Sequence, residues 1–242
     1  MERKKRGITP LLERFYNSND NLYELSIDEA GRGCMFGRVY IACVVLPKNP
    51  DLFSGVNIKD SKKFSSKKKL RETAEYIKEH ALSWHIEYIE NDVIDNINIL
   101  ASVMNGMHDC IKHSMLKINS MVEPTPSDSD YMAIIDGNYF KPYCYYDDSK
   151  SEYCQIPHVT VEKGDGKYMA IAAASILAKT ARDDYIIDLC EKYPILSERY
   201  GLDKNMGYGT KLHLNGINEY GITQWHRRSF GCCKTANINN ID

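Results

Sequence analysis

The chain has 242 residues, of which 43% are hydrophobic and 26% are charged, enough for one large or two small globular domains with a sizeable core. Its formal net charge of −2 excludes a protein that coats nucleic acid by bulk electrostatics, so any nucleic-acid binding must be local. No apolar segment follows the basic start MERKKRG, and no run approaches the roughly 18 apolar residues of a membrane span, so we expect a soluble, cytoplasmic protein that does not bind membranes.

The eight cysteines form no CxxC pair, and some lie in apolar runs such as IACVVL, where a reduced cysteine behaves as a small hydrophobic residue. The cysteines therefore give no reason to expect structural zinc.

The first half of the chain is predicted to alternate strands and helices. Runs rich in β-branched and aromatic residues predict strands at 22–27 and 38–46, joined by a glycine-rich turn, and a third strand in LSWHIEYIE. Serines suited to capping precede good helix formers at 65–80, which predicts a helix. From Asn91 to Met115 the apolar residues recur at steps of three and four, which is the period of one helix face, so we expect one helix there.

The second half continues this alternation. YMAII, residues 131–135, predicts a short strand that ends at Asp136, and IPHVTVE predicts another before KGDG at 163–166. The alanine-rich segment 168–193 predicts a helix that can be buried closely. Strands alternating with helices indicate an α/β fold, with a mixed sheet and helices packed on it.

Carboxylates follow or end several of these strands. Asp28 with Glu29, Asp136 and Asp165 could meet at one edge of the sheet, where their repulsion would need a cation or a proton. Oxygen ligands without histidine suit Mg²⁺ or Mn²⁺, and two such ions can cleave a phosphodiester. Asp28 and Glu29 can share one site only if the strand ends or bends there. The alternative is that each acid is a turn residue or a helix cap.

A set of motifs resembles the ribonuclease HII family, the type 2 ribonucleases H, and it covers nearly the whole chain. In the family's order, the motifs are IDEAGRG, YIACVVLP, KDSKKFS, IDGN, KGDGKY, AAASILAKTARD, MGYGTKLH and HRRSF. The related ribonuclease HIII would have threonine in place of Arg32, so GRG favours ribonuclease HII.

The resemblance implies a ribonuclease H-like mixed β-sheet flanked by helices, divided into a catalytic domain at 1–195 and a helical extension at 196–242 that contributes to substrate binding. It also implies two Mg²⁺ or Mn²⁺ ions during catalysis. The catalytic, metal-binding residues that it implies are Asp28, Glu29, Asp136 and Asp165.

Two further acids, Asp183 and Asp184, are candidate ligands by charge alone. The family's metal aspartate lies in the KGD segment, which selects Asp165. Asp183 is then expected to pair with Lys179, one turn earlier on the same helix.

The resemblance implies that the GRG backbone and Tyr208 read a 2′-hydroxyl at a DNA–RNA junction, with the paired basic residues on phosphates. Taken alone, Tyr208 could be a half-buried packing residue. The residues expected to bind substrate are Gly31, Arg32, Gly33, Lys62, Lys63, Tyr208, Arg227 and Arg228.

The activity implied is an endonuclease that cuts RNA in RNA–DNA hybrids and cuts 5′ of single ribonucleotides in duplex DNA, leaving 3′-OH and 5′-phosphate ends. Such an enzyme would act in ribonucleotide excision repair and in primer RNA removal during DNA replication. Two alternative functions are a non-catalytic hybrid-binding module and a phosphohydrolase of small molecules. The first would need a missing carboxylate, and the second leaves GRG and GYGT unexplained.

Further expectations concern partners and one insertion. We expect a monomer that binds nucleic acid. TPLLERFY, residues 9–16, loosely resembles a sliding-clamp peptide, but it lacks the glutamine and could equally pack on the domain as a short helix. The stretch at 143–155 is longer than the family's common connection, and we interpret it as a surface insertion.

Overall fold

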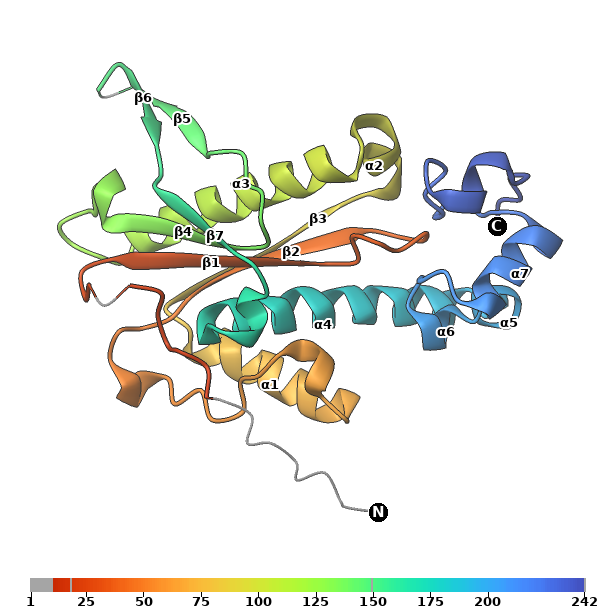
Figure 1. Cartoon of the computed structure of the whole chain (residues 1–242), viewed down its shortest axis with the longest axis horizontal. Helices are drawn as coiled ribbons and strands as arrows, with labels where there is room; N and C mark the ends of the chain where they lie inside the picture. The colour runs from red at the N-terminus through yellow and green to blue at the C-terminus, as the bar shows by residue number, and fades with distance from the viewer. Residues whose placement is uncertain (1–10, 18, 149, 242) are drawn as a thin grey trace, which may run out of the picture.

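A five-stranded mixed sheet forms the centre of the molecule in a computed structural model that describes residues 11–17, 19–148 and 150–241 (Figure 1). The strand order is β3-β2-β1-β4-β7, in which β2 is antiparallel to both of its neighbours, β1 and β3, whereas β1, β4 and β7 are parallel to one another. The strands span Tyr23–Ala30 (β1), Val39–Val45 (β2), Ser83–Ile89 (β3), Tyr131–Asp136 (β4) and His158–Val161 (β7).

Helices cover both faces of this sheet (Figure 1). One face carries α3, which packs on β2 and β3, and the other carries α4 with α1 beside it. Alanines let α4 lie close to the sheet, and Ala172, Ala173 and Ala174 are fully buried against strand residues such as Ala42. The principal helices span Lys67–His80 (α1), Asn91–Ile97 (α2), Ile99–Asn119 (α3) and Met169–Lys192 (α4).

Short helices after α4 form a smaller part at one end of the molecule (Figure 1). A cluster of buried residues that includes Phe36, Ile186 and Leu196 joins this part to α4 and to the turn between β1 and β2. The division at residue 195 therefore stays a prediction, because the two sides share this core. The helices span Ile195–Tyr200 (α5), Leu202–Asn205 (α6) and Lys211–Tyr220 (α7), and a 3₁₀ turn follows at Gly231–Thr235.

The stretch interpreted as a surface insertion forms a hairpin that projects from the sheet (Figure 1). Its strands are β5, Cys144–Asp147, and β6, Glu152–Gln155, which pair in antiparallel register as a separate two-stranded sheet. Most of its side chains are exposed or half-buried, and Tyr153 is 81% exposed.

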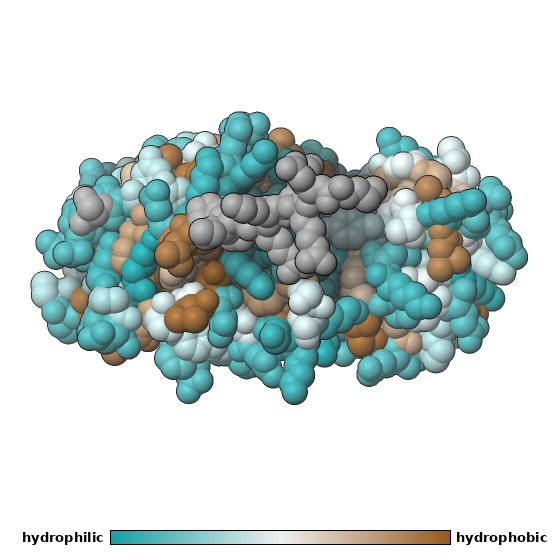
Figure 2. Space-filling model, turned by 60° about the horizontal axis from the view of Figure 1, so that its bottom comes forward, coloured by the Kyte–Doolittle hydropathy of each residue, from teal (hydrophilic) through white to brown (hydrophobic). Residues whose placement is uncertain are grey.

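The surface in Figure 2 is mostly hydrophilic, with hydrophobic residues scattered over it. The outline is notched between the larger body and the smaller C-terminal part. Within the described ranges, no helix combines the length and the apolar character that crossing a membrane requires.

The single helix predicted from Asn91 to Met115 is wrong, because the chain breaks into α2 and α3 at Asn98. Asn98 has φ 69° and ψ 162°, a conformation that almost only glycine adopts freely. Its side chain accepts a hydrogen bond from the Ala101 backbone N–H at 3.0 Å and so caps α3. The apolar period continues across the break, which is why the sequence pattern did not reveal it.

We predict that Asn98→Ala destabilises the fold by about 1–3 kcal/mol, because it removes the cap and leaves a Cβ at a positive φ. Asn98→Gly is the matched control, since glycine also loses the cap but relieves the backbone. It should cost clearly less than alanine. Urea unfolding measures the free energy of unfolding of both variants. An equal loss in the two would mean that the backbone at Asn98 is not strained.

Candidate active site

The carboxylates Asp28 and Glu29 lie near the end of β1, beyond the last residue pair that β1 forms with β4. That pairing stops at Ile27 with Ile135, whereas β1 continues against β2 through Ala30. β1 thus runs one residue past the two acids before it ends. Strand β4 also ends here, and its end leaves room beside β1 for both carboxylates to border one site.

Asp136 is the last residue of β4, and Asp165 lies in a single 3₁₀ turn at Gly164–Gly166. The Gly164 backbone N–H donates to Asp136 Oδ1 at 2.6 Å, which joins this turn to the end of the strand. A Cβ at position 164 would overlap the side chain of Ile171 and crowd Asp136 Oδ1, so glycine permits this close approach.

The carboxylates interact electrostatically. Burial raises the pKa of Asp28 well above its usual value, and the charges of Asp136 and Glu29 raise it further. Burial also raises the pKa of Asp136, and Asp165 adds to the effect, although the Gly164 N–H opposes it. The pKa of Glu29 is raised by burial against the favourable charge of Arg32, whose Nη1 lies 3.4 Å from Glu29 Oε1. The structure thus brings Asp28, Glu29, Asp136 and Asp165 together.

The donor chemistry of this group fits hard divalent cations. All the side-chain donors are carboxylate oxygens, and a buried Asp28 beside Asp136 is costly unless positive charge offsets it. In the described part of the chain, no three of these carboxylates have oxygens that all lie within 4.8 Å of one another.

Ser175, which the sequence analysis missed, connects this site to the turn that contains Lys62 and Lys63. It lies in the alanine run of α4, and its hydroxyl hydrogen-bonds both with the Asp28 carboxylate and with Ser61 Oγ at 3.0 Å. Ser61 begins the 3₁₀ turn Ser61–Lys63. A polar residue among small apolar ones was the available signal, since a buried hydroxyl needs a partner.

One lysine of this turn lies beside the carboxylates. Lys62 Nζ is 3.4 Å from Asp165 Oδ2 on a side chain that is 80% exposed. Its ammonium group can therefore meet an anionic ligand that approaches the carboxylates. Lys63 is also exposed, but it pairs with Asp60 at 3.7 Å and lines a separate cavity of about 610 Å³ that also reaches Gly166.

The two other candidate acids, Asp183 and Asp184 of α4, each form an ion pair with a basic side chain. Asp183 Oδ2 accepts from Lys179 Nζ at 2.9 Å, which confirms the pairing expected on the helix. Asp184 pairs with Arg71 of α1.

Two buried arginines hold the loop that contains GRG. Arg182 of α4 lies against Gly31, where φ is +91°, and its Nη2 donates to the Phe36 carbonyl at 3.2 Å. Arg227 Nε donates to the Gly37 carbonyl at 2.9 Å, and its Nη1 donates to the Arg32 carbonyl at 3.1 Å. These bonds fix the loop from behind and leave the Arg32 side chain half exposed.

The arrangement of Arg227 differs from the expected phosphate contact. Its side chain is fully buried, and burial lowers its pKa to about 10, so it stays charged at neutral pH. Carbonyl acceptors take the place that a phosphate would fill. Arg228 is exposed, and its backbone N–H donates to Asp95 Oδ2 at 2.7 Å, which leaves its guanidinium on the surface.

Tyr208 extends from the segment before α7 to the same loop. The Met35 N–H donates to the Gly207 carbonyl at 2.9 Å, which joins the two segments. The Tyr208 side chain lies beside Cys34 and 6.0 Å from the Arg182 guanidinium, and the residue is 51% exposed. Burial raises the pKa of its phenol, which therefore stays protonated and able to donate at neutral pH. The structure thus places Gly31, Arg32, Gly33 and Tyr208 around one loop.

The buried pair His213 and His226 supports this segment. His213 Nδ1 hydrogen-bonds to the Tyr208 carbonyl at 3.0 Å, and the two Nε2 atoms are 3.1 Å apart. Burial lowers the pKa of His226 to about 3, so the pair is neutral at physiological pH.

The family model and the curated relatives that match this chain all carry the same family description. A family model described as "Ribonuclease HII" matches residues 25–233. The chain is 39% identical over 221 residues to a "Ribonuclease HII" of Bacteroides thetaiotaomicron, which covers 91% of this chain and 96% of that relative. A "Ribonuclease HII" of Parabacteroides distasonis is 40% identical over 207 residues, covering 86% and 89%.

Solved structures resemble this fold. The ribonuclease HII in a PCNA complex from Archaeoglobus fulgidus superposes with a TM-score of 0.61 at 23% identity, covering 87% of this chain and 96% of that one. The ribonuclease H2 from Pyrococcus horikoshii OT3 gives a TM-score of 0.59 at 20% identity, covering 88% and 96%. At these identities the likeness concerns the fold, which is ribonuclease H-like.

We predict that Gly31→Ala destabilises the protein by about 1–3 kcal/mol, because a Cβ there would meet Arg182 Nε at a positive φ. Gly33→Ala is the matched control two residues away, where a Cβ meets nothing within 4 Å. It should change stability by less than about 0.5 kcal/mol. Urea unfolding compares the two, and equal losses would mean that Arg182 does not limit this loop.

Proposed function

The chain belongs to the ribonuclease HII family and is a metal-dependent type 2 ribonuclease H, and we propose that it also cuts duplex DNA 5′ of single embedded ribonucleotides. The proposed products are a 3′-OH and a 5′-phosphate, and the proposed roles are ribonucleotide excision repair and primer removal. The observation that carries the proposal is the position of the GRG loop and Tyr208 on one shared surface, fixed by Arg182 and Arg227.

We assign the reaction centre to the four carboxylates. Two Mg²⁺ or Mn²⁺ ions held there would activate water and stabilise the leaving oxygen. The protein's part is to hold these ligands, since Ser175 binds the Asp28 carboxylate and the Gly164 N–H binds Asp136. Lys62 adds a positive charge at Asp165, where it can also receive a phosphate.

Substrate recognition is assigned to backbone groups and one phenol. A 2′-hydroxyl is both a donor and an acceptor, so it can be read by the N–H and C=O groups of a glycine-flanked loop. Gly33 supports this assignment, because open space lies where its side chain would be. Lys62, Lys63 and Arg228 are the exposed cations assigned to phosphates, whereas Arg227 is assigned to positioning the loop.

Clamp binding stays a prediction. The Archaeoglobus fulgidus relative was solved in complex with PCNA, but its likeness to this chain concerns the fold. Of the segment at 9–16, residues 9 and 10 lie outside the described residues. The rest packs on the domain without forming a helix, and the Glu13 backbone bonds to Lys167 and Met169 at 2.8 and 2.7 Å.

The test of the proposed function is a DNA duplex with one ribonucleotide, incubated with Mg²⁺ or Mn²⁺ and followed by mapping of the product ends. We expect a cut 5′ of the ribonucleotide. Asp136→Asn should lower the rate on the order of a thousandfold, because the amide cannot supply the charge that holds a cation.

Asp183→Asn is the matched control for that substitution, since Asp183 pairs with Lys179 on the helix surface. It should leave the rate nearly unchanged. Hybrid cleavage without any cut at a single ribonucleotide would contradict the proposed specificity, and near-normal turnover by Asp136→Asn would contradict the assigned centre.

Tyr208→Phe tests the recognition surface. We expect it to slow cleavage at a single ribonucleotide by about 1–3 kcal/mol of barrier, because the phenol can no longer position the one 2′-hydroxyl. Cleavage within a long RNA–DNA hybrid should fall less, and binding to all-DNA duplex should hardly change. Steady-state kinetics on both substrates measures the difference.

The control for this variant is Tyr153→Phe, on the exposed strand β6 of the hairpin. It should change neither rate. An equal loss on both substrates for Tyr208→Phe would mean that the phenol does not distinguish an isolated ribonucleotide.

A further inference from the structure

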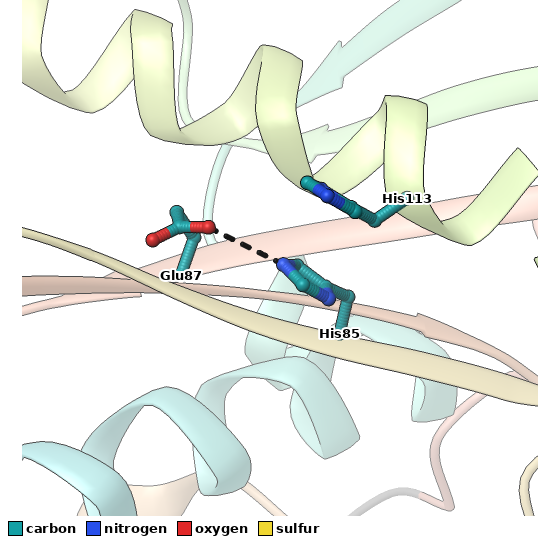
Figure 3. A group of neighbouring side chains, drawn as sticks. All are labelled: His85, Glu87 and His113. Atoms are coloured by element: carbon teal, nitrogen blue, oxygen red, sulfur yellow. Dashed lines mark hydrogen bonds and ion pairs between the residues drawn. The ribbon is translucent and has the colours of Figure 1, made fainter. Parts of the chain in front are cut away.

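A second group of candidate metal ligands lies apart from the carboxylates. It consists of His85 and Glu87 on β3 and His113 on α3 (Figure 3). One ligand atom from each residue lies within 4.8 Å of the other two, and no other such group of three occurs among the residues described. We propose that these three side chains bind a divalent transition-metal ion of the zinc type.

The spacing of His85 and Glu87 supports this proposal. They lie two residues apart on the edge strand, so both side chains point toward the same face, which α3 covers. His85 Nε2 is 3.4 Å from Glu87 Oε2, which is long for a hydrogen bond of an imidazole with a carboxylate. Two ligands that each lie 2.0–2.2 Å from a tetrahedral ion are roughly 3.3–3.6 Å apart, so the observed spacing matches one edge of such a site.

His113 completes the group from the helix. Its Nδ1 lies 2.8 Å from the Asp109 carbonyl and donates to it in the neutral ring, which leaves the lone pair of Nε2 free for a metal. The ring stacks on His85 with centroids 4.3 Å apart and planes at 12°. Because the planes are nearly parallel, binding requires the exposed His113 ring to turn toward the ion (Figure 3).

The ligand set determines the class of ion. Imidazole nitrogens suit Zn²⁺, Ni²⁺ and Cu²⁺, whereas Mg²⁺ and Mn²⁺ prefer oxygen ligands. Two histidines and one glutamate leave a fourth position that water can fill at this half-exposed surface. The ion would join the edge strand to α3, so it should stabilise the folded chain.

The site is distinct from the carboxylate centre. Glu29, Ile41 and Glu87 are register partners across β1, β2 and β3, so the β2 strand and the buried Ile41 side chain separate Glu87 from Glu29. Zinc binding at the histidines can therefore be measured while Mg²⁺ occupies the carboxylates.

The experiment is zinc titration of the full-length, chelator-stripped protein in excess Mg²⁺, with bound zinc counted after dialysis. We expect one Zn²⁺ per chain and a rise of about 5 °C or more in the thermal midpoint at a hundredfold excess over Kd. His113→Gln should weaken binding at least tenfold, the order found when a metal site loses one of its supporting groups. Glu87→Gln should weaken it as well.

The matched control is His80→Gln on α1. His80 makes the same Nδ1 bond to a carbonyl one turn earlier, at 3.0 Å, but it stacks on Tyr76 rather than on a second histidine. This variant should bind zinc normally, and so should Asp136→Asn, which makes the result independent of nuclease activity. Because His113 is exposed, His113→Gln should keep its thermal midpoint in the absence of zinc.

Cobalt provides a second readout, because four-coordinate Co²⁺ absorbs visible light much more strongly than six-coordinate Co²⁺ bound by oxygen ligands. Loss of this strong absorption in His113→Gln is expected. Unchanged zinc affinity in that variant, an equal loss in His80→Gln, or no zinc bound by the unsubstituted protein in Mg²⁺ would each overturn the proposal.

Discussion

Like charges held close together in a partly buried place, where β4 ends beside β1, are the constraint on which the candidate site depends. Burial and the charge of Asp136 both raise the pKa of Asp28, which means that its ionised form is disfavoured. Hydrogen-bond donors that stabilise the ionised carboxylates must therefore lie close to them. The Gly164 N–H binds Asp136, and the Ser175 hydroxyl binds Asp28. The end of β4, the turn after β7 and the alanine face of α4 are therefore placed together by one electrostatic requirement.

The loop between β1 and β2 depends on the C-terminal part of the chain. Arg227 reaches back across 190 residues to the Gly37 carbonyl, and its guanidinium is fully buried there. A buried charge without acceptors would be costly, so the loop and this arginine stabilise one another. The surface proposed to read the 2′-hydroxyl is thus built from both ends of the sequence, and the C-terminal helices are part of the site rather than an addition to it.

Local patterns predicted the elements, and contacts between distant residues limited the rest. The strands and α4 were predicted because alternation and helix propensity act over a few residues. Asn98 breaks a helix whose apolar period continues across it, so only its backbone conformation reveals the break. Arg227 was expected to contact phosphate because its carbonyl acceptors are far away in sequence. Ser175 was hidden among alanines. The family motifs located the carboxylates, but not the partners that hold them.

Two places on the sheet carry donor sets of different chemistry. Carboxylates lie around Asp28 where β4 ends, with Ser175 of α4 beside them, while the edge strand carries His85 and Glu87 against His113 of α3. Oxygen ligands and imidazoles prefer different ions, so the two places can select separate metals from the same solution. Because the β2 strand lies between Glu29 and Glu87, charge at one place reaches the other only through packed protein. A metal at the histidines would therefore act on the stability of the edge strand and α3, rather than on the carboxylates around Asp28.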